Sequence, residues 1–213
     1  MDAFLDFFIR TGVAALLAGI GVNWNLARQR KDAARKYSRE RIEAQIRDYY
    51  GPLHALNAAG EEAFLSFKNR FLFDDRESDR KVIAQADFFA DASKLPDQAQ
   101  LKAWMLWTQE IFLPLNERRQ DIILRLHHLS VQSEIPPSFA AFLAHAQAFR
   151  ATVANWKAGG IDERTGRSRS DFCPALPFPA AFDREVAATL KALEAERVKL
   201  LQQEARWWAL FRP

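Results

Sequence analysis

Cysteine is almost absent from this sequence, whose 213 residues contain only Cys173. A single cysteine excludes an intramolecular disulfide, which is typical of a protein kept in a reducing compartment. Glycine is also scarce, with 8 residues, and no segment keeps the alternation of apolar and polar residues that a half-buried strand requires. Stretches rich in alanine, leucine, arginine and glutamate favour helix instead. We therefore predict an all-α fold.

The sequence also lacks the short motifs that carry catalytic or metal chemistry. It contains no His-Glu-x-x-His, Glu-x-x-His or Cys-x-x-Cys pattern and no Gly-x-Ser-x-Gly elbow. The segment GIDERTGRS (160–168) has the wrong spacing for a phosphate-binding loop, carries Arg167 in place of lysine and follows no strand. Cys173 has no close cationic or histidine neighbour that would lower the pKa of its thiol. We expect no catalytic residue and no cofactor.

Four histidines are the remaining candidate metal ligands. A zinc or iron site needs about three or four converging ligands. A cluster of His127, His128 and His145 across two neighbouring helices would approach that number, and it defines an alternative hypothesis in which the chain is an enzyme or metal protein. The interpretation favoured by the count of ligands is that these histidines lie at a surface or interface and that no metal is bound.

Charge is missing from one stretch near the N-terminus. Residues 11–27 are 17 consecutive uncharged residues, which is the lower end of the length that crosses a membrane as a helix. Extending the stretch back to Phe4 lengthens it but includes Asp6 and Arg10, which share a helix face and can pair. Trp24 is suited to the membrane–water interface at the other end. This pattern predicts a membrane-spanning helix.

The order of charges around this stretch distinguishes an anchor from a signal peptide. A signal peptide carries its cations before the apolar region, whereas here an acidic N-terminus precedes it and the cations follow. We predict that residues 1–27 form a single transmembrane anchor. A cleaved signal peptide and a buried helix of a soluble protein are the alternatives. The positive-inside rule places the N-terminus outside and the rest of the chain in the cytoplasm.

The positive charge of the chain is concentrated directly after the apolar stretch. Residues 28–47 contain eight basic and three acidic residues, a net charge of +5, against +3 for the whole chain. Each cation close to an anionic leaflet contributes about 1 kcal/mol to membrane binding. The cations expected to lie against the inner leaflet are Arg28, Arg30, Lys31, Arg35, Lys36, Arg39 and Arg41.

This concentration of charge also bears on the partners. A nucleic-acid-binding protein more often spreads its charge over a domain face, so we expect a membrane partner and no nucleic acid. We predict that residues 28–50 form a basic juxtamembrane helix. Arginine outnumbers lysine by 21 to 9, and alanine is abundant, which is typical of a GC-rich bacterial genome. The expected location is therefore a bacterial inner membrane.

A helical seam of apolar residues begins within this helix. It consists of Ile42, Ile46, Tyr49 and Leu53. The pair Gly51-Pro52 interrupts the seam, because proline lacks a backbone donor and disfavours helix at the residue before it. We predict a kink or a helix break at Gly51 and Pro52, where the chain would have a hinge.

Residues 51–213 are predicted to form a cytoplasmic antiparallel bundle of about five or six helices. A short helix is expected over 82–92. The next helix, which opens at Pro96, is expected to end near Pro114, so that Asn116 caps a helix over about 116–130. The residues expected to face inward from that helix are Ile122, Leu126 and Leu129.

The most regular apolar face follows the segment EIPPS. It consists of Phe139, Phe142, Ala146, Phe149, Val153 and Trp156, and it predicts a helix that stops at Gly159-Gly160. Residues 159–179 are rich in glycine, proline and serine, and a loop of this length is often functional or disordered.

A last helix is expected from about 180 to 211, and near its end stand Trp207 and Trp208. Flanked by arginines, they fit an interfacial membrane anchor. Core packing of the last turn accounts for them equally well, although neighbouring residues cannot both face one side of a helix.

Three functions are compatible with this pattern. The first is a membrane-anchored, non-enzymatic helical protein that acts through protein–protein interaction or self-association at the inner leaflet. The second is an oligomerising membrane effector that perturbs the bilayer, suggested by Asp6 and Arg10 at the edge of the span and by the hinge. The third is the histidine-based enzyme or metal protein. We favour the first, because the sequence has an anchor and no catalytic constellation.

Overall fold

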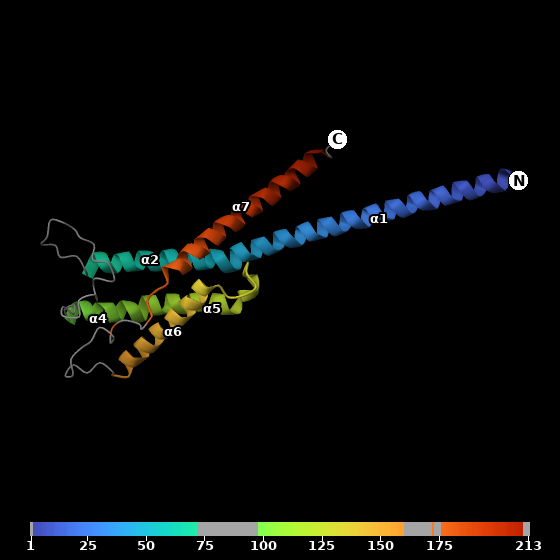
Figure 1. The fold of residues 1–213 in the computed structure, drawn as a ribbon. Coiled ribbons are helices and arrows are strands. Elements are labelled where there is room, and N and C mark those ends of the chain that lie inside the picture. Colours follow the sequence, from blue (N-terminus) through green and yellow to red (C-terminus); the bar gives the residue numbers. More distant parts are fainter. Residues whose placement is uncertain (1, 72–97, 160–171, 173–175, 211–213) are drawn as a thin grey trace. The chain divides into compact units, whose positions relative to one another are not determined.

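A computed structural model of the chain confirms the all-α fold class (Figure 1). It describes residues 2–71, 98–159, 172 and 176–210, with side chains from residue 23 to residue 206 within these ranges. Every regular element of this part of the chain is a helix. The elements are α1 (Asp2–Ala44), the π-helix η1 (Gln45–Tyr50), α2 (Gly51–Phe71), α4 (Gln98–Trp107), the π-helix η2 (Thr108–Phe112), α5 (Leu113–Arg125), the 3₁₀-helix η3 (His127–Leu129), α6 (Pro137–Lys157) and α7 (Ala180–Leu210).

The chain divides into two compact units. The first comprises Met1–Glu43 and Lys199–Pro213, and it therefore joins most of α1 with the end of α7. The second comprises Ala44–Val198 and contains the other helices. The predicted domain boundaries, after residues 27 and 50, stay predictions.

The second unit is built from antiparallel helix pairs. Near its start, α2 meets α5, where Asn57 contacts Arg119, and near its end it meets α4, where Phe67 packs on Trp104. The helices α5 and α6 are paired in the same way, since Gln147 donates to Gln120 at 2.9 Å and Arg150 lies 4.0 Å from Glu117. These contacts bring α2, α4, α5 and α6 together.

Aromatic side chains fill much of the interior of this unit. At one end a cluster forms around Phe67 and Trp104; its buried members are Phe67, Leu101, Trp104, Val153, Trp156 and Phe172. Near the other end, Phe182 of α7 packs on Phe139 and Phe142 of α6, with ring centroids 4.9 and 4.4 Å away. Fully burying one such side chain contributes about 1.5–3 kcal/mol, so these clusters account for much of the stability of the unit.

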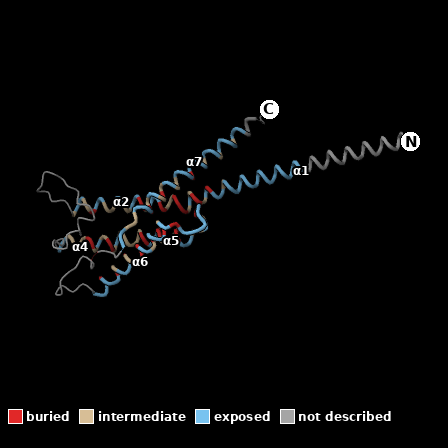
Figure 2. The backbone as a smooth tube through the Cα atoms, in the orientation of Figure 1, coloured by how far each residue is buried: buried red, intermediate tan, exposed pale blue. Residues whose placement is uncertain are grey.

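The apolar face predicted for residues 139–156 is confirmed. All six of its residues are buried on α6 (Figure 2). The helix ends as expected at Gly159, whose φ of 76° lies in the left-handed region and whose N–H donates to the Trp156 carbonyl at 3.1 Å. The apolar seam predicted to begin at Ile42 is also confirmed in its main residues, because Ile42, Tyr49 and Leu53 are buried.

The predicted interruption at Gly51-Pro52 takes a different form. The chain stays helical through this pair, and the π-helix η1 stands directly before it. A proline ring in an α-helix clashes with the carbonyl four residues earlier. The wider π turn relieves this constraint, because the N–H of Gly51 bonds to the carbonyl of Ile46, five residues back. A helix break is therefore not needed, and the kink and the hinge stay predictions.

A π turn also precedes Pro114, and the helix boundaries predicted at this proline are wrong. The N–H of Leu113 bonds to the carbonyl of Thr108, again five residues back, and helix runs without interruption from Gln98 to Arg125. Two predicted helices are thus one. Asn116 lies inside α5, where it cannot act as an N-cap.

The register predicted for this helix is also shifted by one residue. The fully buried apolar side chain is Ile123, whereas Ile122, Leu126 and Leu129 are only half-buried. The helix predicted over 82–92 lies outside the described residues.

Candidate functional site

The basic segment is an exposed helix in the structure, and its position at a membrane stays a prediction. Residues 28–41 all lie within α1, and of the seven cations expected at a leaflet only Arg39 is half-buried (Figure 2). Arg39 lies 3.7 Å from Glu43 on the same helix and 3.2 Å from Glu204 on α7. Lys36 lies 3.9 Å from Glu40. Six of the seven cations are therefore exposed, and the seventh contacts α7.

The aromatic residues expected at a membrane interface are seen only in part. Trp24 is 75% exposed at the start of the described side chains. The side chains of Trp207 and Trp208 lie outside the described residues, as do those of the apolar stretch up to residue 22. Within the part of the chain that is described, no helix is long and apolar enough to cross a membrane.

The three histidines proposed as a metal cluster have different surroundings. The Nε2 atom of His127 lies 3.4 Å from the Ser133 carbonyl, and His128 is exposed. His145 is buried, and its Nδ1 atom lies 2.8 Å from the Leu176 carbonyl. Among the described residues, no group of three or more His, Cys, Asp and Glu side chains is placed to hold a metal ion.

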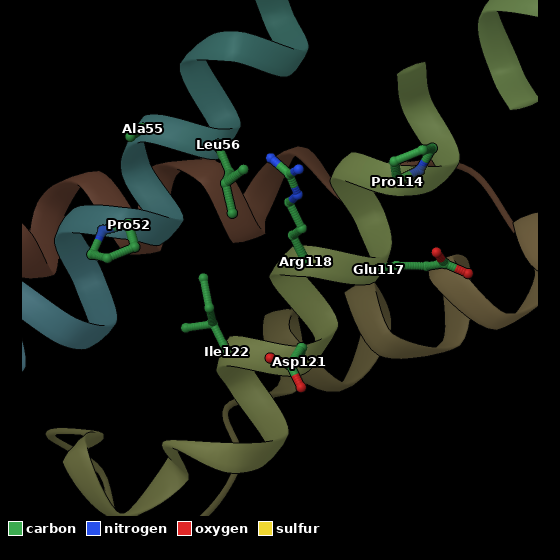
Figure 3. Close-up of a pocket in the computed structure, with 8 residues that line it drawn as sticks. All are labelled: Pro52, Ala55, Leu56, Pro114, Glu117, Arg118, Asp121 and Ile122. Carbon is green, nitrogen blue, oxygen red and sulfur yellow. The ribbon is translucent and has the colours of Figure 1, made fainter. Parts of the chain in front are cut away.

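An open groove lies between α2 and α5 (Figure 3). It encloses about 690 Å³, and its apolar lining includes Pro52 and Pro114, the prolines that follow the two turns. The full lining is Pro52, Ala55, Leu56, Pro114, Glu117, Arg118, Asp121 and Ile122. Its three charged residues are exposed, and two of them already have partners: Glu117 with Arg150 and Asp121 with Arg125. The groove therefore offers an apolar hollow without a buried polar group to orient a ligand.

Gly51 is required at the first π turn for a steric reason. A Cβ atom at this position would collide with the backbone carbonyl oxygen of Ile46, the acceptor of the π-type bond. A backbone atom cannot move aside as a side chain can. The YYGP sequence thus combines the two residues that this geometry needs, a glycine that allows the close approach and a proline that makes the wider turn favourable.

The most unusual feature of the bundle is a buried arginine that the sequence analysis missed. Arg119 of α5 is only 4% exposed, and its guanidinium donates three hydrogen bonds to neutral oxygens. The acceptors are Asn57 Oδ1 at 2.8 Å, Asn116 Oδ1 at 2.8 Å and the Leu56 carbonyl at 2.5 Å. The rings of Phe142 and Phe178 lie 6.0 Å from its Cζ atom. We call Arg119, Asn57 and Asn116 the arginine centre.

Neighbouring helices make room for the arginine centre. Gly60 of α2 stands against the guanidinium, and a Cβ atom there would collide with Arg119 Nη2. Asn57 and Gly60 are three residues apart, so they lie on one face of α2. The pair Asn116 and Arg119 has the same spacing on α5, which brings all four residues together where the helices cross.

Burial changes the ionisation of the groups in and around this centre. It lowers the pKa of Arg119 to about 10, an effect that the charge of Asp183 partly offsets. Burial likewise raises the pKa of Asp183 in the first turn of α7, against the opposing influence of Arg119. Even so lowered, the pKa keeps Arg119 charged at pH 7. The bundle therefore holds a permanent positive charge that neutral amide oxygens and one nearby carboxylate stabilise.

Chemically, the arginine centre is a structural contact. Arg119 donates to three acceptors of the protein itself, and the lining of the groove includes none of the three residues of the centre. The sequence does contain a pattern that indicates the arginine centre. Asn116, Arg119 and Ile123 have the spacing of one helical face, but a search for apolar residues overlooks this face because two of the three residues are polar.

Comparison with known proteins does not add a family to these observations: no family model, no curated protein and no solved structure matches this chain.

Proposed function

We propose that this chain is a membrane-anchored, non-enzymatic helical protein that acts at the inner leaflet by binding a partner protein or a second copy of itself. Residues 1–27 would form the anchor, and the N-terminus would lie outside. Residues 28–50 would follow the leaflet, and the bundle would lie in the cytoplasm. The observation that carries this proposal is the exposed cationic helix over residues 28–41, directly after the apolar stretch.

The placement of cations on this helix supports a lipid-facing role. Arg28, Lys31 and Arg35 follow one another at spacings of three and four residues, which puts them on one face of α1. Three cations close to an anionic leaflet contribute on the order of 3 kcal/mol, enough to hold the helix at the surface once the anchor has brought it there. Trp24, exposed one turn before Arg28, fits the headgroup region.

Fractionation of the full chain tests the anchor. Fused at its C-terminus to a fluorescent protein that folds only in the cytoplasm, the chain should stay in the membrane pellet after an alkaline carbonate wash and should fluoresce. The double substitution Leu16→Arg with Leu17→Arg should release it, because each arginine near the middle of a span costs about 2.5–3.5 kcal/mol. A matched control, Leu106→Arg with Leu124→Arg, changes two exposed leucines of the bundle and should leave the chain in the pellet.

Two results would contradict the anchor. One is a wild-type chain that the carbonate wash removes from the membrane. The other is a Leu16/Leu17 variant that stays in the pellet as firmly as the control.

The interaction half of the proposal has its own test. The full chain extracted in mild detergent should migrate as a homo-oligomer or retain a stoichiometric protein partner after affinity purification. A monodisperse monomer without a partner would argue against it.

A further inference from the structure

Two side chains of the bundle hold the segment that leads into α7. Trp104 of α4 donates its Nε1–H to the Phe172 carbonyl at 2.9 Å, and His145 of α6 contacts the Leu176 carbonyl through Nδ1 at 2.8 Å. Because a carbonyl oxygen only accepts, Nδ1 of His145 carries the hydrogen. Both contacts join a buried ring to a backbone oxygen. They differ in one respect: indole does not titrate, whereas imidazole does.

The surroundings of His145 suit its neutral form. The residue is 4% exposed, and the rings of Phe149 and Phe178 lie 5.5 and 5.4 Å from its own. Phe178 also lies 6.0 Å from the guanidinium of Arg119, so the same ring touches a permanent cation. A proton added to His145 would place a second positive charge in an apolar site that already holds one.

We propose that His145 is an acid-sensitive latch: its neutral imidazole holds residues 176–179 and the first turn of α7 on the bundle, and protonation releases them. The latch therefore holds a segment of the same chain, and a change of pH controls it. The inference concerns the bundle alone and does not depend on the membrane anchor.

Among the described residues, one charged group acts on His145 directly, and further charged groups act on it through that residue. On α5, Arg119 opposes protonation of His145. On α7, Asp183 acts on Arg119 and is itself influenced by Glu61 and His54 of α2. Burial is the largest influence on His145 and lowers its pKa, while the carbonyls of the held segment act in the opposite direction.

The direction of the effect follows from linkage. The pKa of His145 in the closed state is below its ordinary value of 6.5, so the released state binds the proton more readily. The latch is closed above about pH 6.5 and weakens as the pH falls below it. Within that window the released population should rise about ten-fold per pH unit, until the closed-state pKa is reached. Asp183, whose pKa is raised, favours the closed state as it gains a proton, so it cannot be the source of the release.

Hydrogen exchange of the full chain in detergent tests the latch. After correction for the chemical exchange rate, peptides covering residues 176–186 should lose protection about ten-fold per pH unit below pH 6.5. Peptides within α2 and α5 should not. His145→Gln keeps an amide donor for the Leu176 carbonyl but does not titrate, so the pH step should vanish.

Two control variants separate the latch from its neighbours. Trp104→Phe removes the other side-chain contact and should loosen the chain near Phe172 equally at every pH. Asp183→Asn should retain the step, since Asp183 is not the sensor. A step that persists in His145→Gln, or that disappears in Asp183→Asn, overturns the proposal.

A titration of the wild-type histidines covers the case in which His145→Gln does not fold. In histidine-selective NMR of the full chain, one of the four histidines should titrate below pH 6.5, in step with the loss of protection at residues 176–186. Four histidines that all titrate at or above 6.5, or protection that is constant from pH 7.5 to the acid end of the window, would reject the latch.

Discussion

Two arginines of this chain meet their surroundings in opposite ways. Arg39, in the basic part of α1, keeps 36% of its side chain exposed and lies near two carboxylates, Glu43 and Glu204. Arg119, in the bundle, is 4% exposed and binds three neutral oxygens. At the surface water solvates the charge, and the ion pairs add little. Inside the bundle the protein must replace the water, and it does so with amide and carbonyl oxygens placed by two helices.

The comparison separates an arginine that the packing of the bundle requires from one that lies at the surface. Removing a buried arginine leaves its acceptors without partners in a site that excludes water. Removing an exposed one leaves a solvated gap. The sequence does not distinguish these cases, because Arg118 and Arg119 are neighbours and only the second is buried.

The largest expected effect is therefore the loss of the arginine centre. Arg119→Leu should lower the free energy of unfolding by about 3–5 kcal/mol, because the oxygens of Asn57, Asn116 and Leu56 lose their donors. Its neighbour provides a matched control: Arg118→Leu should change stability by less than about 0.5 kcal/mol. Guanidinium unfolding of the detergent-solubilised chain, followed by tryptophan fluorescence, measures both. Equal costs at the two positions would contradict the distinction.

A smaller effect is expected when the space for the guanidinium is reduced. Gly60→Ala should destabilise by about 1–3 kcal/mol, since the new methyl group would collide with Arg119 Nη2. Helix propensity alone predicts a gain of about 1 kcal/mol for this change, so the two explanations differ in sign. The same unfolding experiment decides between them. A stabilised Gly60→Ala protein would show that the guanidinium moves aside freely.

Tyr49 and Tyr50 allow the effect of burial on ionisation to be tested by the pH dependence of unfolding. Both are almost fully buried. The Tyr50 hydroxyl accepts a hydrogen bond from the Val131 N–H at 3.2 Å, whereas the Tyr49 hydroxyl has no hydrogen-bond partner among the residues that the structure describes. Burial raises the pKa of Tyr49 above its ordinary 10. Above pH 10 the folded state keeps this proton while the unfolded state releases it. The free energy of unfolding therefore falls by about 1.4 kcal/mol per pH unit as the pH rises above 10.

Tyr49→Phe should remove this alkaline loss and should be close to neutral at pH 7, because no hydrogen bond is given up. Tyr50→Phe should cost about 1 kcal/mol at pH 7. Unfolding curves at pH 7, 10 and 11 measure these differences. A Tyr49→Phe protein that loses stability above pH 10 as steeply as the wild type would contradict the assignment to Tyr49.

The smallest effect is expected at the exposed side of the comparison. Arg39→Ala and Glu204→Ala should each cost less than about 1 kcal/mol, and the cost should shrink in high salt, which screens exposed pairs. A double-mutant cycle between the two residues, run at low and high salt, measures the pair alone. A coupling that exceeds 1 kcal/mol and does not respond to salt would place Arg39 in the buried class.

The sequence allowed the helices to be predicted where apolar residues repeat regularly. The face from Phe139 to Trp156 and its end at Gly159 are found as expected. The prediction was wrong at Pro114, where a helix boundary was expected, because proline is normally a sign of interruption and the π turn before it removes the clash. The sequence analysis also predicted that Ile122 faces the interior, whereas Ile123 is the buried residue. The buried face of α5 begins with the polar residues Asn116 and Arg119, and a search for regularly spaced apolar residues does not include them.

By itself, the sequence determined the all-helical character of the chain, the concentration of positive charge over residues 28–47 and the regular apolar faces. These are properties of neighbouring residues, and local spacing and composition are sufficient to reveal them. Only the tertiary structure decided that Arg119 is buried and that His145 holds the segment before α7. Each depends on atoms more than 30 residues away in the sequence or on a neighbouring helix, such as Asn57 and Leu176. Burial and its effect on charge arise only when the helices pack.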